Sequence, residues 1–132
     1  MAVRVLRLGT TRARDEGLRL GTVRRPPRGV PKTEYASRDF YDLWLPELAP
    51  SEALVKQAQR AADDRAWRAF EQRYRAEMKR PEPGRLLALL AALSRQTNFS
   101  VGCYCADEAR CHRSVLRQLL REHGAVLARG EE

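Results

Sequence analysis

Three cysteines and a histidine lie within ten residues of one another, from Cys103 to His112. With Arg113 they bring thiol, imidazole and guanidinium groups into one short stretch. A thiolate is a nucleophile and a metal ligand, an imidazole is an acid, a base or a ligand near neutral pH, and a guanidinium binds phosphate and carboxylate oxygens. We therefore predict a functional site here, and its candidate catalytic residues are Cys105, Cys111, His112 and Arg113.

The residues around this cluster predict a strand, a short polar loop and a helix. From Phe99 to Cys105 every second residue is apolar, which is typical of a strand. From Cys111 to Gly124 the apolar residues recur at helical spacing. A helix N-terminus carries about half a positive charge, so it binds anions and favours a thiolate. We therefore expect Cys111, at this helix start, to be the most acidic of the three cysteines.

A second basic segment follows an earlier predicted strand. The stretch 24–32, RRPPRGVPK, contains three prolines and a glycine, which exclude regular structure, and four basic side chains. We predict that this loop and the 105–113 turn face the same cleft, because each follows a strand and attracts anions. The residues that we expect to contact a phosphate-bearing or other anionic ligand are Arg24, Arg28, Gly29, Tyr104, Arg110 and Ser114.

A metal site is an alternative. Cys105, Cys111 and His112 are ligands that suit zinc, and three protein ligands are typical of an open, catalytic zinc site. A closed site lacks a fourth ligand, because His123 follows His112 by eleven residues, or about 16 Å along a helix. Zinc is thus a candidate cofactor, although the sequence requires none.

Nucleic-acid binding is a further alternative. The chain has 25 Lys and Arg against 17 Asp and Glu, a formal net charge of +8, and such a balance favours anionic partners. Arg113, Arg117 and Arg121 recur at four-residue steps on the last predicted helix, as a phosphate backbone would require. Solvent-exposed helix faces also carry such stripes, so the pattern does not separate nucleic acid from a small anion. A phosphatase-like Cys–x5–Arg loop does not start at Cys105, because Cys111 stands six residues after it, and the Cys–x2–Cys motif of thioredoxins is absent. Whether the protein is an enzyme therefore stays open.

The rest of the chain predicts one α/β domain over residues 1–132, with a small, mostly parallel sheet flanked by helices. The first two strands, joined by a hairpin or parallel, precede an aromatic segment read as a short helix or turn and a run of helices. The last of these helices is apolar on most sides and is expected to be buried. The predicted elements are strands at Val3–Leu6 and Leu18–Val23, a turn or helix at Tyr35–Leu48, helices at 51–64, 65–80 and 84–96, and a final short strand at 125–128.

We expect a cytoplasmic protein with no membrane contact. No apolar run approaches the 18 residues that a bilayer requires, and the first ten residues lack the apolar region of a signal peptide. Cysteines without an export signal indicate a reducing compartment. We predict no structural disulfide and a monomer or weak homodimer.

Four segments, PPRGVPK, DLWLPELAPS, WRAFEQRYRAEM and CYCADEARCHRSVL, resemble in the same order the bacterial family called domain of unknown function 488. The resemblance extends from about Val3 to Leu120. The Cys–x5–Cys–His–Arg motif that ends at Arg113 is typical of one large branch, and the Pro–Arg–Gly loop resembles its shorter, basic branch. That branch often has Asp-Arg-Leu-Trp before the loop, where this chain has Val23 to Pro26. The resemblance implies an α/β fold and a cytoplasmic bacterial protein, and it implies no particular reaction.

Overall fold

Four parallel strands form the sheet, in the order β1–β4–β2–β3. The computed structural model describes residues 1–105 and 107–128, and its strands are β1 (Val3–Arg7), β2 (Leu18–Gly21), β3 (Leu43–Trp44) and β4 (Phe99–Cys103). β4 comes last in the chain but lies between β1 and β2, where Val101 pairs with Val5 on one side and Leu20 on the other. The predicted α/β fold is confirmed. The first two strands are parallel and separated by β4, so the hairpin alternative is wrong.

β4 is buried along its whole length, because both faces of the sheet are covered. Phe99 and Val101 belong to the main core, whereas the hydroxyl of Ser100 donates to buried Glu16 on the opposite face. Gly102 is needed for close packing, since a Cβ at this position would lie 2.6 Å from the carbonyl oxygen of Leu6.

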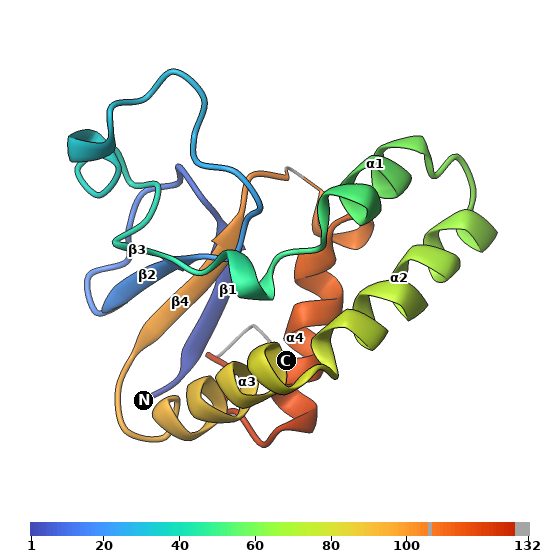
Figure 1. Cartoon of the computed structure of the whole chain (residues 1–132). Helices are drawn as coiled ribbons and strands as arrows, with labels where there is room; N and C mark the ends of the chain where they lie inside the picture. Colours follow the sequence, from blue (N-terminus) through green and yellow to red (C-terminus); the bar gives the residue numbers. More distant parts are fainter. Residues whose placement is uncertain (106, 129–132) are drawn as a thin grey trace.

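The helices lie to one side of the strands, and the long segment between β2 and β3 projects on the other (Figure 1). Two of the helices begin after a side-chain cap, since the Ser51 hydroxyl accepts the Leu54 N–H and the Asp63 carboxylate accepts the Ala66 N–H. The helices are α1 (Glu52–Arg60), α2 (Asp64–Met78), α3 (Pro81–Leu93) and α4 (His112–Glu122), with 3-10 turns η1 (Lys32–Glu34), η2 (Pro46–Leu48) and η3 (Glu108–Arg110). No helix within residues 1–105 and 107–128 is long and apolar enough to cross a bilayer.

Two hydrophobic clusters stabilise this arrangement. The larger joins the sheet to α2 and α4, and it includes the stacked rings of Trp67, Phe70 and Tyr74. The smaller lies at the carboxyl ends of the strands and contains Leu8, Val23, Tyr41, Cys103 and Cys111. Two of the three cysteines are therefore packed inside the protein.

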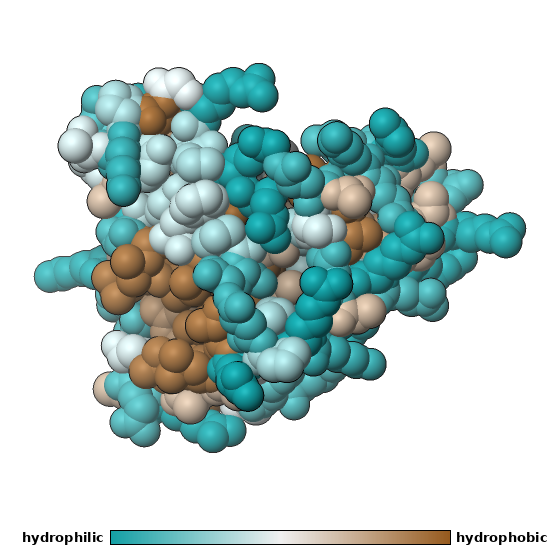
Figure 2. All heavy atoms as spheres, in the orientation of Figure 1, coloured by the Kyte–Doolittle hydropathy of each residue, from teal (hydrophilic) through white to brown (hydrophobic). Residues whose placement is uncertain are grey.

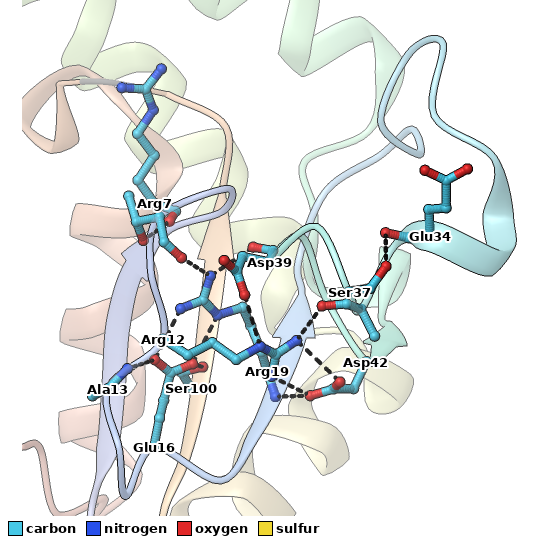
Figure 3. A network of polar contacts seen from close by, with 12 residues as sticks. Arg7, Arg12, Ala13, Glu16, Arg19, Glu34, Ser37, Asp39, Asp42 and Ser100 are labelled. Carbon is cyan, nitrogen blue, oxygen red and sulfur yellow. Dashed lines mark hydrogen bonds and ion pairs between the residues drawn. The ribbon is translucent and has the colours of Figure 1, made fainter.

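A polar network covers the other face of the sheet (Figure 3). Buried Arg19 on β2 donates to the carbonyl oxygens of Thr10 and Asp39, and its backbone N–H donates to Asp42. The carboxylate of Asp42 also pairs with Arg12 at 2.8 Å. Loops that are distant in sequence are thus tied to the central strands by one arginine.

Three predicted elements differ in the structure. The aromatic segment contains β3, a strand too short for its alternation to show in the sequence. α3 begins at Pro81 rather than Gly84, because a proline in the first turn needs no N–H partner. The final strand is reduced to one parallel bridge between Val3 and Leu127, and residues 129–132 lie outside the described part of the chain.

Not every large apolar residue is buried. α3 buries Leu87 and Leu90, but Leu89 is 52% exposed, so the predicted burial of this helix holds for one face only. Exposed apolar side chains also gather beside β2 and β3, where Leu18 and Leu43 reach the surface (Figure 2).

Candidate functional site

The predicted site lies where the carboxyl ends of β2 and β4 meet the start of α4. Cys103 ends β4, Thr22 follows β2, and Cys111 is the residue that precedes the first turn of α4. Open parallel sheets bind ligands beyond the carboxyl ends of their strands, because the loops there can carry functional groups on a rigid base. The strand–turn–helix predicted from the sequence is therefore placed where a ligand site is expected.

Three thiols gather at this position, and two of them are in direct contact. Cys103 and Cys111 are buried and their Sγ atoms are 2.7 Å apart, whereas Cys105 is exposed. Hydrogen bonds from Cys103 and then from Cys111 lower the pKa of Cys105, and the same interactions raise the pKa of Cys103. These opposite shifts in pKa favour the thiolate on Cys105, which is the exposed thiol.

Cys111 behaves differently from the expectation drawn from its position at a helix start. The hydrogen bond from Cys103 lowers the pKa of Cys111, but donation to Cys105 and burial together outweigh it and raise this pKa to about 11. The prediction that Cys111 is the most acidic thiol is wrong. The helix terminus acts on it, but the surrounding protein removes the water that a thiolate would need.

His112 is held in one tautomer. Its Nε2–H donates to the carbonyl oxygen of Thr22 at 2.7 Å, and this leaves Nδ1 with a lone pair 3.8 Å from the Sγ atom of Cys111. Burial lowers the pKa of His112 to about 4, although the bond to Thr22 opposes this. The ring is consequently neutral at pH 7, and Nδ1 can accept a proton or bind a metal ion.

Arg113 supports the site from inside. Its side chain is buried and one terminal nitrogen donates to the carbonyl oxygen of Cys105 at 2.7 Å. Its Nε–H has no hydrogen-bond partner among the described residues. Arg113 thus fixes the backbone of Cys105, and its positive charge also lowers the pKa of that thiol.

A cavity of about 420 Å³ opens beside the thiols. The loop after β2 forms one wall and the end of β4 forms another, so the prediction that the two segments face the same cleft is confirmed. The predicted site residues in its lining are Arg24, Arg28, Tyr104, Cys105 and His112.

The other predicted ligand contacts have different partners. Arg110 pairs with Asp64 on α2 at 2.7 Å, and Ser114 donates to the carbonyl oxygen of Cys111 at 3.0 Å. Gly29 follows Arg28 in the loop with φ +74°, a conformation that glycine adopts without strain. Cys111 and Arg113 are buried behind the cavity rather than in its lining.

The cations of the cavity wall differ in how they are held. Arg24 donates to the carbonyl oxygens of Ala49 and Pro50, and Arg25 pairs with Glu52. The described residues provide no ion pair for Arg28 or for Lys56. These two side chains are therefore available to a ligand.

Sequence reasoning missed the contributions of α1 and of β2. Lys56 and Gln59 line the cavity from α1, but a polar residue on an amphipathic helix looks the same whether it faces solvent or a ligand. Thr22 acts through its backbone carbonyl, which leaves no signal in residue type.

The arginine stripe expected on the last helix is not continuous. Arg113 is buried, Arg117 pairs with Glu108 at 2.6 Å, and only Arg121 of the three is exposed. This helix face therefore presents one exposed arginine of the three to a phosphate backbone.

A set of possible metal ligands also lies at the site. One ligand atom from each of Cys103, Cys111 and His112 lies within 4.8 Å of the other two, so this group could bind a metal ion. The sequence had suggested Cys105 in place of Cys103. Cys103 takes the place of Cys105 because its Sγ atom lies 2.7 Å from that of Cys111, whereas Cys105 is not part of the compact group, although both residues line the cavity.

A family model described as the active DUF488-N3 subclade, DUF488-N3a, matches residues 3–124. No curated protein and no solved structure matches the chain.

Proposed function

This chain belongs to the domain of unknown function 488 family. From the geometry of the site we propose that it binds a phosphate-bearing or similar anionic ligand in the cavity beyond β2 and β4. One observation carries the proposal: Arg24, Arg28 and Lys56 line the same cavity as an exposed thiol and a buried, neutral imidazole.

The charge of the lining supports an anion. The cavity wall contains four cationic side chains and one carboxylate, Glu52, which is paired with Arg25. The remaining positive charge is only partly offset by backbone carbonyls, so the potential in the cavity is positive. A volume of about 420 Å³ falls within the usual range for small-molecule pockets, roughly 300–1,000 Å³.

The residues of the cavity wall would have different roles in ligand binding. Arg28 and Lys56 would contact the ligand, because neither is engaged in an ion pair among the described residues. Arg24 is fixed by two carbonyl oxygens, and the hydroxyl of Tyr104 donates to the carbonyl oxygen of Arg25. Arg24 and Tyr104 would therefore position the loop from which Arg28 projects.

Cys105 would be the reactive group if the bound ligand is also transformed. It is exposed and lines the cavity, whereas Cys111 is only 2% exposed and lies behind it. In metal-free protein His112 would act as base through Nδ1, since its other nitrogen is occupied by Thr22.

Binding of inorganic phosphate tests the proposal. In a buffer without multivalent anions, phosphate should raise the unfolding temperature of the wild-type chain, and calorimetry should give a dissociation constant. The double variant Arg28→Ala, Lys56→Ala should bind at least about tenfold more weakly, because each charge-assisted hydrogen bond contributes about 1.5–3 kcal/mol.

The matched control is Arg121→Ala, Arg14→Ala, which removes two exposed arginines outside the cavity lining. This control should bind phosphate like the wild type. Equal losses in both variants would mean that phosphate responds to net charge, and the proposal would then be wrong.

An oligonucleotide titration separates this function from nucleic-acid binding. We expect a single-stranded oligonucleotide to bind weakly and not to compete with phosphate. Tight binding with a steep salt dependence, lost in the Arg121 control, would instead assign the surface to nucleic acid.

A further inference from the structure

The buried ligand atoms of Cys103, Cys111 and His112 form a second feature of the site, distinct from the cations of the cavity wall. We propose that these three residues bind one zinc ion through the two Sγ atoms and Nδ1 of His112, with the fourth coordination position open toward the cavity. Two thiolates and one imidazole are a ligand set that selects zinc over the harder cations magnesium and calcium.

The orientation of His112 is the strongest support. A histidine that binds a metal usually donates its other ring N–H to a carbonyl or carboxylate, which fixes the ring and its tautomer. Here Nε2–H donates to Thr22 at 2.7 Å and Nδ1 lies 3.8 Å from the Sγ atom of Cys111. In a tetrahedral zinc site with ordinary bond lengths, a nitrogen and a sulfur ligand are about 3.5 Å apart.

The two sulfur atoms need a small adjustment. Two thiolates on one tetrahedral zinc ion are about 3.8 Å apart, whereas Cys103 and Cys111 have their Sγ atoms 2.7 Å apart. A modest rotation of either side chain about its Cα–Cβ bond supplies the difference. On binding, each thiol loses its proton to solvent, so one zinc ion forms two Zn–S bonds and one Zn–N bond and two protons are released.

The ion would be accessible from the cavity. Cys103 and His112 both line it, together with the exposed thiol of Cys105. Cys105 is not a member of the compact ligand group, so we assign it no bond to the ion. A site with three protein ligands and one open position is typical of catalytic rather than structural zinc.

This inference does not depend on the proposed anion binding, because no cation of the cavity wall is a ligand. Phosphate binding by metal-free protein and metal binding by the Arg28→Ala, Lys56→Ala variant can each be measured alone. Failure of one proposal is therefore visible while the other stands.

Cobalt substitution tests the site directly. The full chain is purified under reducing conditions, freed of metal with a chelator and titrated with Co²⁺. We expect one equivalent to bind per chain, with the visible bands of tetrahedral Co²⁺ and a near-ultraviolet sulfur-to-cobalt charge-transfer band, and Zn²⁺ should displace it. Absence of the charge-transfer band in the wild type would overturn the proposal, whatever the variants do.

Serine variants identify the ligands. Cys103→Ser and Cys111→Ser should each weaken Zn²⁺ binding by roughly 100-fold or more, since even residues around a metal site contribute about 10- to 100-fold. Cys105→Ser is the matched control and should keep one equivalent of Co²⁺ and the charge-transfer band. Loss of the metal in Cys105→Ser would overturn the three-ligand assignment.

A thiol count on the chelated, reduced wild type completes the test. Three titratable thiols in denaturant are expected. A persistent bond between Cys103 and Cys111 under these conditions would mean that neither sulfur is free to bind zinc, and the proposal would be wrong.

Discussion

Arg19 and Glu16 form a two-point ion pair inside the protein, with Nε 2.8 Å from Oε2 and the second nitrogen 2.9 Å from Oε1. Arg19 is fully buried and Glu16 is 2% exposed. The carboxylate also accepts hydrogen bonds from Ser100 and from the backbone of Ala13. Glu16, in the loop before β2, therefore connects Arg19 on β2 with Ser100 on β4. The candidate site lies at the carboxyl ends of these two strands.

Removing one charge of this pair should destabilise the fold. Glu16→Gln leaves the guanidinium of Arg19 buried without its counter-charge, and we expect a loss of about 3 kcal/mol in the free energy of unfolding, measured by urea denaturation. The matched control is Asp15→Asn, which removes an exposed pair with Arg4 and should change stability by less than about 1 kcal/mol. Similar losses in the free energy of unfolding of the two variants would contradict the expectation that the buried ion pair contributes more than the exposed one.

The same carboxylate should make stability depend on pH. Burial alone would raise the pKa of Glu16, but hydrogen bonds from Arg19, Ser100 and Ala13 more than offset it and lower this pKa from 4.5 to about 2. A group whose pKa is lowered by folding stabilises the protein fully above its unfolded pKa and ceases to do so as the folded form is protonated. The contribution of Glu16 should therefore be present above pH 4.5 and be lost as pH falls from about 4.5 to 2.

Glu16→Gln provides the comparison for this pH dependence. The difference in unfolding free energy between wild type and variant should be constant near neutral pH and shrink below pH 4.5. A difference that stays constant down to pH 2 would show that the charge of Glu16 has no part in it.

Cys105 should be the first cysteine to react in metal-free protein. It is exposed and its pKa is lowered by hydrogen bonds from Cys103 and Cys111, whereas those two are buried. Because a low pKa preserves the thiolate as pH falls, iodoacetamide should label Cys105 even below neutral pH. Peptide mass spectrometry after timed labelling gives the order, and denatured protein, in which all three should label together, is the control. Faster labelling of Cys111 would contradict the structure.

Two glycine substitutions should have effects of opposite sign. Gly102→Ala places a Cβ 2.6 Å from the carbonyl oxygen of Leu6, so β1 and β4 must separate, and we expect a loss of roughly 2 kcal/mol. Gly84→Ala lies in α3, where the nearest atom is 3.6 Å away, and should stabilise by up to about 1 kcal/mol because alanine favours helix. Thermal and urea unfolding of both variants measure the difference. Equal changes in stability would mean that the backbone around Gly102 moves to accommodate the added Cβ without an energetic cost.

The sequence by itself determined the class of the fold and indicated where the candidate site lies. Apolar alternation over β4, helical spacing over α4 and the caps at Ser51 and Asp63 act over a few residues, so they can be read without knowing the tertiary structure. The clustering of three cysteines around one strand-to-helix turn marked the site in the same way, and so did the basic loop that contains Arg28.

Only the tertiary structure decided which thiol is acidic, which arginines are open and how the strands are ordered. A pKa depends on burial and on partners such as Cys103 for Cys105, and neither is encoded in spacing along the chain. Arg28 and Arg113 look alike in the sequence, but one is exposed at the cavity and the other is buried against the carbonyl of Cys105. The carbonyl of Thr22, ninety residues before His112, sets the tautomer of that ring through a backbone atom that every residue type possesses.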